Sequence, residues 1–418
     1  MGKKKRITGR FIRPPVFVSL LIIATFFISS YDNKCHPAPS QSPTSSSTHE
    51  KLVNYYTQMQ SNLTGFDFVK SKVLNPRADF LQPWIAFDWK YEDYKIYLEQ
   101  LKAQGMKYVV LQYVAKAEVV KGKAKLTENY FHLHDEDENP HLPAVYAKST
   151  DDTFVSELDI VDNLFLAAED LGMKVYLGTL WSEQWWNDEF KDAKWRAEIL
   201  ALEKILISYF ITRYKNMLNM EDTFAGVYYT HEMYGNMLGY ENHWNKMLGT
   251  IREHVYSQDP SLKFIASLFC SEYYLFDDSG GKTVEGKMQK FISDLFINNG
   301  KPVLKNGDIV SVQDKLATHP KTGVEYNAKF LHAVRDVLKV LATDHKTPLK
   351  YSIIVENFTP DFHLASADRY AQQILICSQL ADELMVFSYS RYAMPKDKLN
   401  RPIKEGSKNG VLTTARSE

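Results

Sequence analysis

The feature that most constrains this chain is a regular alternation of short apolar runs with longer segments of helical periodicity, beginning near Asp79. The short runs are rich in β-branched and aromatic residues, which is typical of strands buried on both faces. Most are followed by an amphipathic segment, so a crossover helix would join each strand to the next, as parallel strands require. The eight expected strands are Phe80–Phe87, Lys107–Tyr113, Lys174–Leu180, Phe224–Thr230, Lys263–Phe269, Asp308–Val312, Lys350–Val355 and Glu383–Ser388.

Eight strand–helix units without a repeat signature predict a (β/α)8 TIM barrel in a single domain. Gly105 and Gly172 support the helix boundaries, because each lies where a helix needs a left-handed residue before the next strand. A doubly wound open sheet is the alternative fold. It is disfavoured because no glycine-rich phosphate loop follows the first expected strand.

The N-terminal segment predicts export. Basic residues from Lys3 to Arg13 precede an uncharged apolar run, Val16 to Ser30, which is the pattern of a secretory signal. The run is short for a membrane span, so the segment is either a cleaved signal peptide or a signal anchor. We therefore expect the body of the protein to be extracytoplasmic, either secreted or held at the membrane.

The expected organisation follows from these patterns. It comprises a signal peptide or signal anchor (1–31), a Pro/Ser-rich linker (32–50), a helical lead-in (51–78), the barrel catalytic domain (79–400) and a polar tail (401–418). The formal net charge of −1 provides no field that would attract nucleic acid, so no nucleic-acid partner is expected. The three cysteines have no metal-ligand spacing, and neither a metal nor another cofactor is expected.

Carboxylates directly follow two of the expected strands. The fourth strand ends in Glu232 and the seventh in Glu356. In a barrel of this kind active sites lie at the carboxyl ends of the strands, and burying a carboxylate there is costly unless it is paired. Glycoside hydrolysis needs two carboxyl groups flanking the scissile bond. We therefore predict Glu232 and Glu356 as catalytic residues acting on a carbohydrate substrate.

Polar and aromatic residues near the strand ends are the expected substrate-binding set. Tryptophan and tyrosine rings suit stacking on a sugar face, and the polar groups suit its hydroxyls. The set is His231, Trp84, Gln112, Trp181, Tyr229, Tyr234, Gln313, Asp314, Asn357 and Tyr389.

This arrangement resembles the large clan of retaining glycosidases built on the same barrel. By that resemblance Glu232 would be the acid/base, after strand four, and Glu356 the nucleophile, after strand seven. The sequence departs from the clan at His231, where the clan has an asparagine that binds the sugar 2-hydroxyl, which leaves the sugar specificity open.

Four short motifs carry a closer resemblance, over roughly residues 79–390. They are Phe80-Leu81-Gln82-Pro83-Trp84, Val110-Leu111-Gln112-Tyr113, Thr230-His231-Glu232 and Val312-Gln313-Asp314. They are similar to a bacterial barrel family, domain-of-unknown-function family 4434, which is grouped by fold with glycoside hydrolases. The resemblance implies the fold and the hydrolase class, and it implies no particular substrate.

Two other functions remain open from the residues alone. The chain could be a non-catalytic carbohydrate-binding barrel that handles envelope glycans. It could also be a metal-dependent sugar isomerase or lyase, in which His231, Glu232, Asp314 and Glu356 would supply an oxygen-rich ligand set.

Overall fold

The computed structural model describes residues 73–134, 153–269, 284–315, 323–397 and 399–403. The chain divides into two units, and all of these residues belong to the second, Leu52–Glu418. The expected signal segment, the linker, most of the helical lead-in and nearly all of the polar tail lie outside the described residues. None of the helices in the described ranges combines the length and the apolarity that crossing a bilayer would need.

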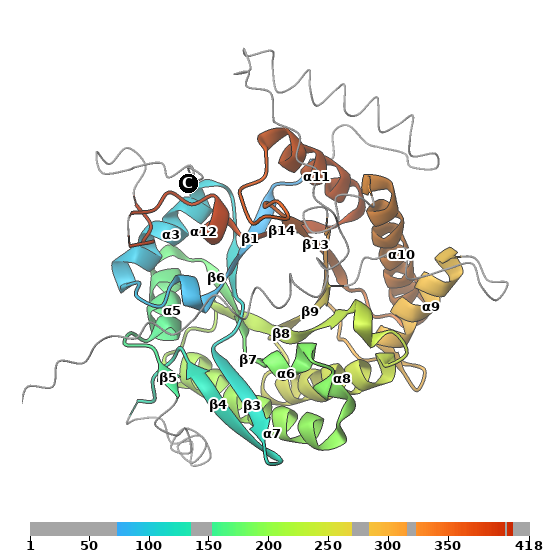
Figure 1. Cartoon of the computed structure of the whole chain (residues 1–418), viewed down its shortest axis with the longest axis horizontal. Helices are drawn as coiled ribbons and strands as arrows, with labels where there is room; N and C mark the ends of the chain where they lie inside the picture. The colour runs from blue at the N-terminus through green and yellow to red at the C-terminus, as the bar shows by residue number, and fades with distance from the viewer. Residues whose placement is uncertain (1–72, 135–152, 270–283, 316–322, 398, 404–418) are drawn as a thin grey trace, which may run out of the picture. The chain divides into compact units, whose positions relative to one another are not determined.

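Eight parallel strands close into a barrel, which confirms the predicted (β/α)8 fold (Figure 1). In chain order they are β1 (Pro76–Leu81), β2 (Tyr108–Leu111), β6 (Lys174–Gly178), β8 (Phe224–Tyr234), β9 (Lys263–Phe269), β12 (Ile309–Gln313), β13 (Lys350–Glu356) and β14 (Glu383–Phe387). Each strand pairs with its neighbours in chain order, and β14 pairs with β1 to close the ring.

The first strand differs from its expected position. It was expected at Phe80–Phe87, but β1 spans Pro76–Leu81 and a short 3-10 helix, η1 (Pro83–Ile85), follows it. The physical reason is Pro83, whose nitrogen carries no hydrogen to donate to the ladder, so the strand ends before it. Residues 76–78, expected in the helical lead-in, therefore belong to the barrel wall.

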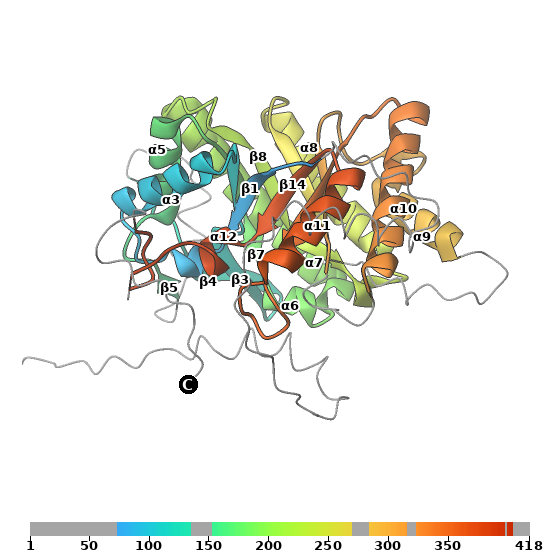
Figure 2. The same cartoon turned by 90° about the horizontal axis from the view of Figure 1, so that it is seen from above.

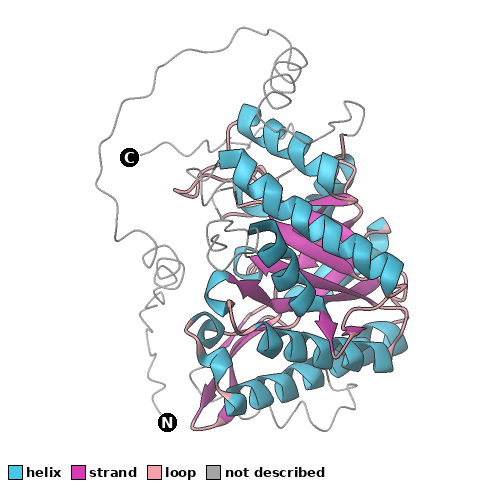
Figure 3. Ribbon diagram, turned by 90° about the vertical axis from the view of Figure 1, so that its right-hand side faces the viewer, coloured by secondary structure: helices cyan, strands magenta, loops and turns pink. Residues whose placement is uncertain are grey.

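Helices surround the strands, as Figures 2 and 3 show from two further sides. The longer ones are α3 (Tyr91–Ala103), α5 (Ile160–Leu171), α7 (Ala193–Ile211), α8 (Glu241–Gln258), α9 (Val284–Phe296), α10 (Gly323–Asp344) and α11 (Ala367–Leu380). Local signals set their ends: the Asp159 side chain accepts from the backbone N–H of Asp162 at the start of α5, and Gly172 ends it with φ of 61°.

A small second sheet lies beside the barrel after β2. The strands β3 (Ala115–Val120) and β4 (Lys123–Asn129) form an antiparallel hairpin, and β5 (Phe154–Val155) and β7 (Leu180–Trp181) pair with its two edges. Figure 1 shows this hairpin extending next to α7.

Side-chain alternation divides the buried apolar residues into two clusters. The larger cluster lies between the strands and the helices. The smaller one fills the barrel interior, and its fully buried members are Ala78, Phe80, Tyr108, Val110, Tyr176, Tyr228, Ile265, Ile309, Ile354 and Met385. Because successive side chains of a strand point to opposite faces, this inner cluster shows which residues at the strand ends face the interior.

Candidate active site

The carboxyl end of the barrel interior is polar. Two residues beyond the inner Phe80, Val110 and Ile354 along their strands come Gln82, Gln112 and Glu356. Gln313 follows the inner Ile309 at the same alternation on β12. Together with Glu232, these positions place two carboxylates and three amides next to the apolar residues that fill the barrel interior.

Glu232 faces the interior by the ordinary alternation of β8, because it lies four residues after the inner Tyr228 on the same strand. The hydroxyl of Tyr228 donates a hydrogen bond to its carboxylate. Between the pairs Tyr229–Ala266 and Met233–Leu268, β8 has two residues more than its partner β9, so the ladder is irregular next to Glu232. Bulges are common next to functional sites.

The Glu232 carboxylate is 7% exposed and hydrogen-bonded on both oxygens. The Gln313 side-chain amide lies 3.2 and 3.3 Å from them. Burial raises the pKa of Glu232, while the hydrogen bonds from Tyr228 and Gln313 and the nearby Lys315 cation oppose part of that shift. A carboxyl group with a raised pKa can remain protonated where an ordinary glutamate has ionised, which suits a proton donor.

Glu356 ends β13 and is 1% exposed. Its backbone is fixed by side chains: its N–H donates to Asp314 Oδ1 at 3.3 Å, and its carbonyl accepts from Gln373 Nε2 at 3.0 Å. Gln373, on α11, also donates to Asp314 Oδ2 at 2.7 Å. The expected substrate-binding role of Asp314 is therefore corrected: its carboxylate lies behind the strand and positions the backbone of Glu356.

Two consecutive residues at the end of β12 connect the two glutamates. Gln313 points inward and holds the Glu232 carboxylate, whereas Asp314 points outward and holds the Glu356 backbone. The structure thus brings Glu232, Gln313 and Glu356 together at one end of the barrel.

His231 and Tyr229 are not at the barrel mouth, which corrects their expected role in substrate binding. Their rings are 1% and 0% exposed and lie on the outer face of β8. The His231 ring lies 5.0 Å from that of Trp185 and 5.9 Å from that of Trp195. Burial lowers the pKa of His231 to about 3, so the imidazole is neutral. This placement also removes His231 from the metal-ligand set considered above.

Three further expected binding residues are engaged by the protein itself. The hydroxyl of Tyr234 donates to the Trp185 carbonyl at 3.0 Å. The amide of Asn357 donates to a backbone carbonyl in the chain after β14, at 3.3 Å. The hydroxyl of Tyr389 donates to Gln100, on α3, at 3.3 Å. Their side chains support the wall of the barrel.

The expected aromatic residues Trp181 and Trp84 lie in different surroundings. Trp181 is on β7, in the small sheet, where its ring stacks on Tyr113 with 5.9 Å between centroids. Trp84 lies in η1 at the carboxyl end of the barrel, under the guanidinium of Arg391.

Several side chains at the site were not predicted from the sequence. Tyr228, Gln82 and Arg391 contact the predicted set: Gln82 donates to Gln112 at 3.1 Å and accepts from Arg391 at 3.4 Å. Gln82 belongs to the motif Phe80-Leu81-Gln82-Pro83-Trp84, and Arg391 closely follows the eighth strand. The sequence therefore contained a signal that both residues lie near the site. Tyr228 lies four residues before Glu232 on the same strand, so strand alternation offered a signal for it as well.

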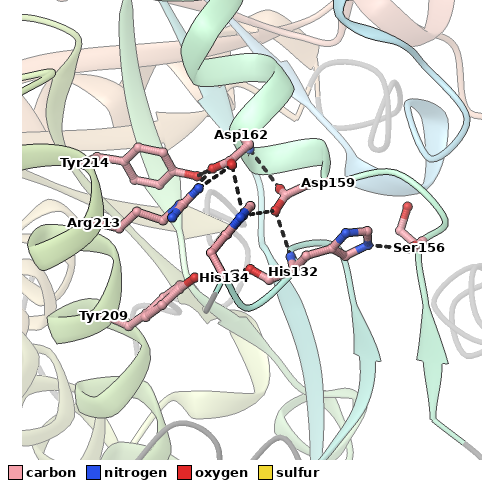
Figure 4. Close-up of polar contacts among 8 residues, drawn as sticks. All are labelled: His132, His134, Ser156, Asp159, Asp162, Tyr209, Arg213 and Tyr214. Carbon is pink, nitrogen blue, oxygen red and sulfur yellow. Dashed lines mark hydrogen bonds and ion pairs between the residues drawn. The ribbon is translucent and has the colours of Figure 1, made fainter. Parts of the chain in front are cut away.

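A second polar cluster lies outside the barrel, between α5 and the π-helical turn η3 (Thr212–Met217) that follows α7 (Figure 4). Ligand atoms of His134, Asp159 and Asp162 lie close enough together to hold a metal ion. However, Arg213 binds both oxygens of Asp162, and Asp159 caps α5. Burial raises the pKa of Asp162, but the hydrogen bonds from Arg213 and Tyr214 outweigh it and lower the pKa. These contacts describe a structural ion-pair network.

A hollow of about 340 Å³ lies elsewhere, between the β3–β4 hairpin and the start of α7. Side chains of both charges line it, among them Lys121, Glu189, Asp192 and Lys194. None of the residues of the glutamate pair borders it, so we do not identify it with the candidate active site.

The fold and the interior glutamates together define a (β/α)8 barrel with an acidic pair at the catalytic end. Residues 79–399 match the family described as "Domain of unknown function (DUF4434)", and the chain belongs to that family. None of the curated proteins compared with the chain matches it in sequence.

Solved structures share the barrel. A protein from Bacteroides thetaiotaomicron, provisionally described as an alpha-L-fucosidase, is 17% identical, with a TM-score of 0.52 over 79% of this chain and 90% of that one. An endo-1,4-beta-D-mannanase from Thermotoga petrophila is 14% identical, with a TM-score of 0.46 over 80% and 90%. An intracellular xylanase from Thermoanaerobacterium saccharolyticum is 14% identical, with a TM-score of 0.41 over 81% and 94%. At these identities the fucosidase-like structure supports the fold alone.

Proposed function

We propose that the chain is a retaining glycoside hydrolase, with Glu232 as the acid/base and Glu356 as the nucleophile. The observation that carries this proposal is the pair of buried glutamates on the inner face of β8 and β13, tied together through Gln313 and Asp314. The environment of Glu232 suits the acid role, because its carboxylate is held by a tyrosine and an amide and its pKa is raised by burial.

The reaction would run in two steps. Glu232 protonates the glycosidic oxygen while the Glu356 carboxylate attacks the anomeric carbon, so the glycosidic bond breaks and a glycosyl ester forms. A water molecule then attacks the same carbon, giving its proton to Glu232 and releasing Glu356. The hydrogen bond from Tyr228 and that from Gln313 hold Glu232 in one orientation throughout.

The proposed substrate is an extracytoplasmic glycan. This rests on the basic and apolar N-terminal segment, 1–31, which predicts either secretion or a membrane anchor.

The test is hydrolysis of a panel of polysaccharides by the full chain and by Glu232→Gln and Glu356→Gln. We expect Glu356→Gln to release no product above background and Glu232→Gln to lose about 10²- to 10⁴-fold in kcat. Glu383→Gln is the matched control, because Glu383 begins β14 at the opposite end of the barrel, where it accepts a hydrogen bond from Tyr108. The first product of the wild type should keep its anomeric configuration by NMR.

The other two functions predict different results in the same assay. Saturable glycan binding without hydrolysis, unchanged in both variants, would favour a carbohydrate-binding barrel. Activity lost on chelation and restored by a divalent cation would favour a metal-dependent isomerase or lyase.

A further inference from the structure

An arginine that has no acidic partner among the described residues lies at the carboxyl end of the barrel. Arg391 is in the short helix α12 (Tyr389–Tyr392), just after β14, and its side chain is half-buried. Its guanidinium donates one hydrogen bond, to Gln82 Oε1 at 3.4 Å. It otherwise faces aromatic rings, with its central carbon 5.0 Å from the centroid of Trp84 and 4.9 Å from that of Tyr392.

The two fully buried arginines have carboxylate partners, and three half-buried ones, Arg196, Arg335 and Arg369, donate to backbone carbonyls. Arg252 pairs with Asp308 at 2.6 Å, and Arg213 pairs with Asp162 at 2.5 Å. For Arg391, no carboxylate among the described residues lies within 4.0 Å. A partly desolvated cation without a counter-ion is costly, so its retention at this place needs a reason.

The surroundings of Arg391 compensate its charge only in part. The aromatic rings contribute cation–π attraction, but burial still lowers the pKa of the guanidinium. A second cation is adjacent, since Lys396 Nζ donates to the Arg391 carbonyl at 3.1 Å. Burial, together with the charge of Arg391, lowers the pKa of Lys396 to about 8. The Asp79 carboxylate opposes part of the shift at Lys396, but it is engaged by the backbone N–H groups of Tyr389 and Ser390.

This cationic region adjoins the glutamate pair. Gln82, which accepts from Arg391, also donates to Gln112 in the polar layer of the barrel interior. Tyr392 lies within the electrostatic influence of both groups: burial raises its pKa most, Arg391 opposes the shift and Glu356 adds to it. A substrate that reaches Glu356 would thus pass close to the guanidinium.

We propose that Arg391 binds a carboxylate of the substrate, so that the glycan contains uronic acid residues. The planar guanidinium matches a carboxylate in a two-point contact, and the rings of Trp84 and Tyr392 hold it in position before binding. The Gln82 and Gln112 amides are placed to meet neighbouring hydroxyls. This inference rests on the proposed function, because Arg391 lies at the same end of the barrel as the glutamate pair.

The experiment measures binding in the full chain carrying Glu356→Gln, so that turnover does not interfere. The probes are polygalacturonate, polyglucuronate and alginate, each beside its carboxyl-reduced neutral form. We expect at least one acidic polymer to bind about 10- to 100-fold more tightly than its reduced form. Adding Arg391→Gln should abolish that difference, and Arg391→Lys should restore part of it, because the charge returns without the planar fork.

Arg401→Gln is the matched control, since Arg401 lies in the same segment but is paired with Asp397 at 2.8 Å. It should leave the preference for the acidic polymer intact. Thermal unfolding of each variant checks that Arg391→Gln still folds, and Arg391→Lys provides the readout if it does not.

Equal affinity for the acidic and reduced polymers would overturn the inference, and so would a preference that survives Arg391→Gln. Arg391-dependent binding of a glycan that carries sulfate groups and no carboxylates, with no binding of any polyuronate, would overturn it as well. Its failure is distinguishable from that of the proposed function. Hydrolysis of a neutral glycan without Arg391 dependence would refute this inference alone, whereas Arg391-dependent uronate binding without any hydrolysis would refute the hydrolase and leave the site.

Discussion

At the scale of single residues, the alternation of β8 places two neighbours in different environments. Glu232 faces the interior, while His231 faces α7 and lies 3.8 Å from the buried Glu203 carboxylate, measured from Nδ1 to Oε2. Thr179 donates to the other Glu203 oxygen at 2.7 Å. Burial raises the pKa of Glu203 to about 8, so both members of this pair are neutral near pH 7.

Glu203 should make the fold less stable as the pH rises. Between its usual pKa of 4.5 and the folded-state pKa of about 8, the unfolded chain ionises Glu203 and the folded chain keeps the proton. The unfolded state then binds fewer protons, so the free energy of unfolding falls with pH, by at most about 1.4 kcal/mol per pH unit. Glu203→Gln removes this slope. Unfolding temperatures at pH 5, 6, 7 and 8 should diverge in favour of the variant, and parallel curves would contradict the assignment.

Glu232 should set the alkaline limb of catalysis. In the proposed mechanism Glu232 is the proton donor and must be protonated, and burial raises its pKa, so activity should be lost as the pH rises through that pKa. The pH dependence of kcat/KM for the wild type should show this limb, and the residual activity of Glu232→Gln should lack it. An unchanged limb in the variant would assign the proton donor to another group.

At the scale of the elements, β8 carries Glu232 at the correct place only if it lies close against β9. A Cβ at Gly226 would meet the Lys263 backbone oxygen at 2.0 Å, so no side chain fits there without moving a strand. The contact lies in the register pairing Gly226 with Lys263, just before the bulge.

We expect Gly226→Ala to destabilise the fold by roughly 1–3 kcal/mol and to reduce activity as well, because β8 must shift. Gly249→Ala, on α8, is the control: its Cβ would come no closer than 3.5 Å to Val303, and it should stabilise the helix by up to about 1 kcal/mol. Urea unfolding of both variants measures the difference. Equal midpoints would show that β8 can adjust.

At the scale of the whole molecule, the barrel is closed by contacts between the beginning and the end of the described chain. β1 pairs with β14 in parallel register. The Asp79 carboxylate, on β1, accepts from the backbone N–H groups of Tyr389 at 2.6 Å and Ser390 at 3.0 Å, at the start of α12. These long-range contacts make the ring of strands one cooperative unit.

A chain ending at Leu380, which lacks β14, should therefore lose cooperative unfolding altogether, as followed by circular dichroism. A chain ending at Ile403, which lacks only the segment expected to be a polar tail, should unfold at the wild-type temperature. A sharp transition in the shorter chain would show that seven strands suffice.

The sequence by itself determined the fold class, and it offered the two glutamates as candidate catalytic residues. Both depend on local signals, since the alternation of strand and helix periodicity is written residue by residue, and a carboxylate directly after an apolar strand is visible without any partner. Two strand positions differ appreciably from the expected ones: β1 ends before Pro83, and β8 extends to Tyr234, four residues beyond its expected end at Thr230.

The tertiary structure alone decided which neighbours face the site. Consecutive residues of a strand face opposite sides, and the register of β8 in the ring of strands decides that Glu232 faces the interior and His231 the helices. The same applies to Asp314, whose carboxylate turns outward to the Glu356 backbone, and to Arg391, whose lack of an acidic partner depends on residues distant in the chain. These relations are set by packing between elements, which no local pattern encodes.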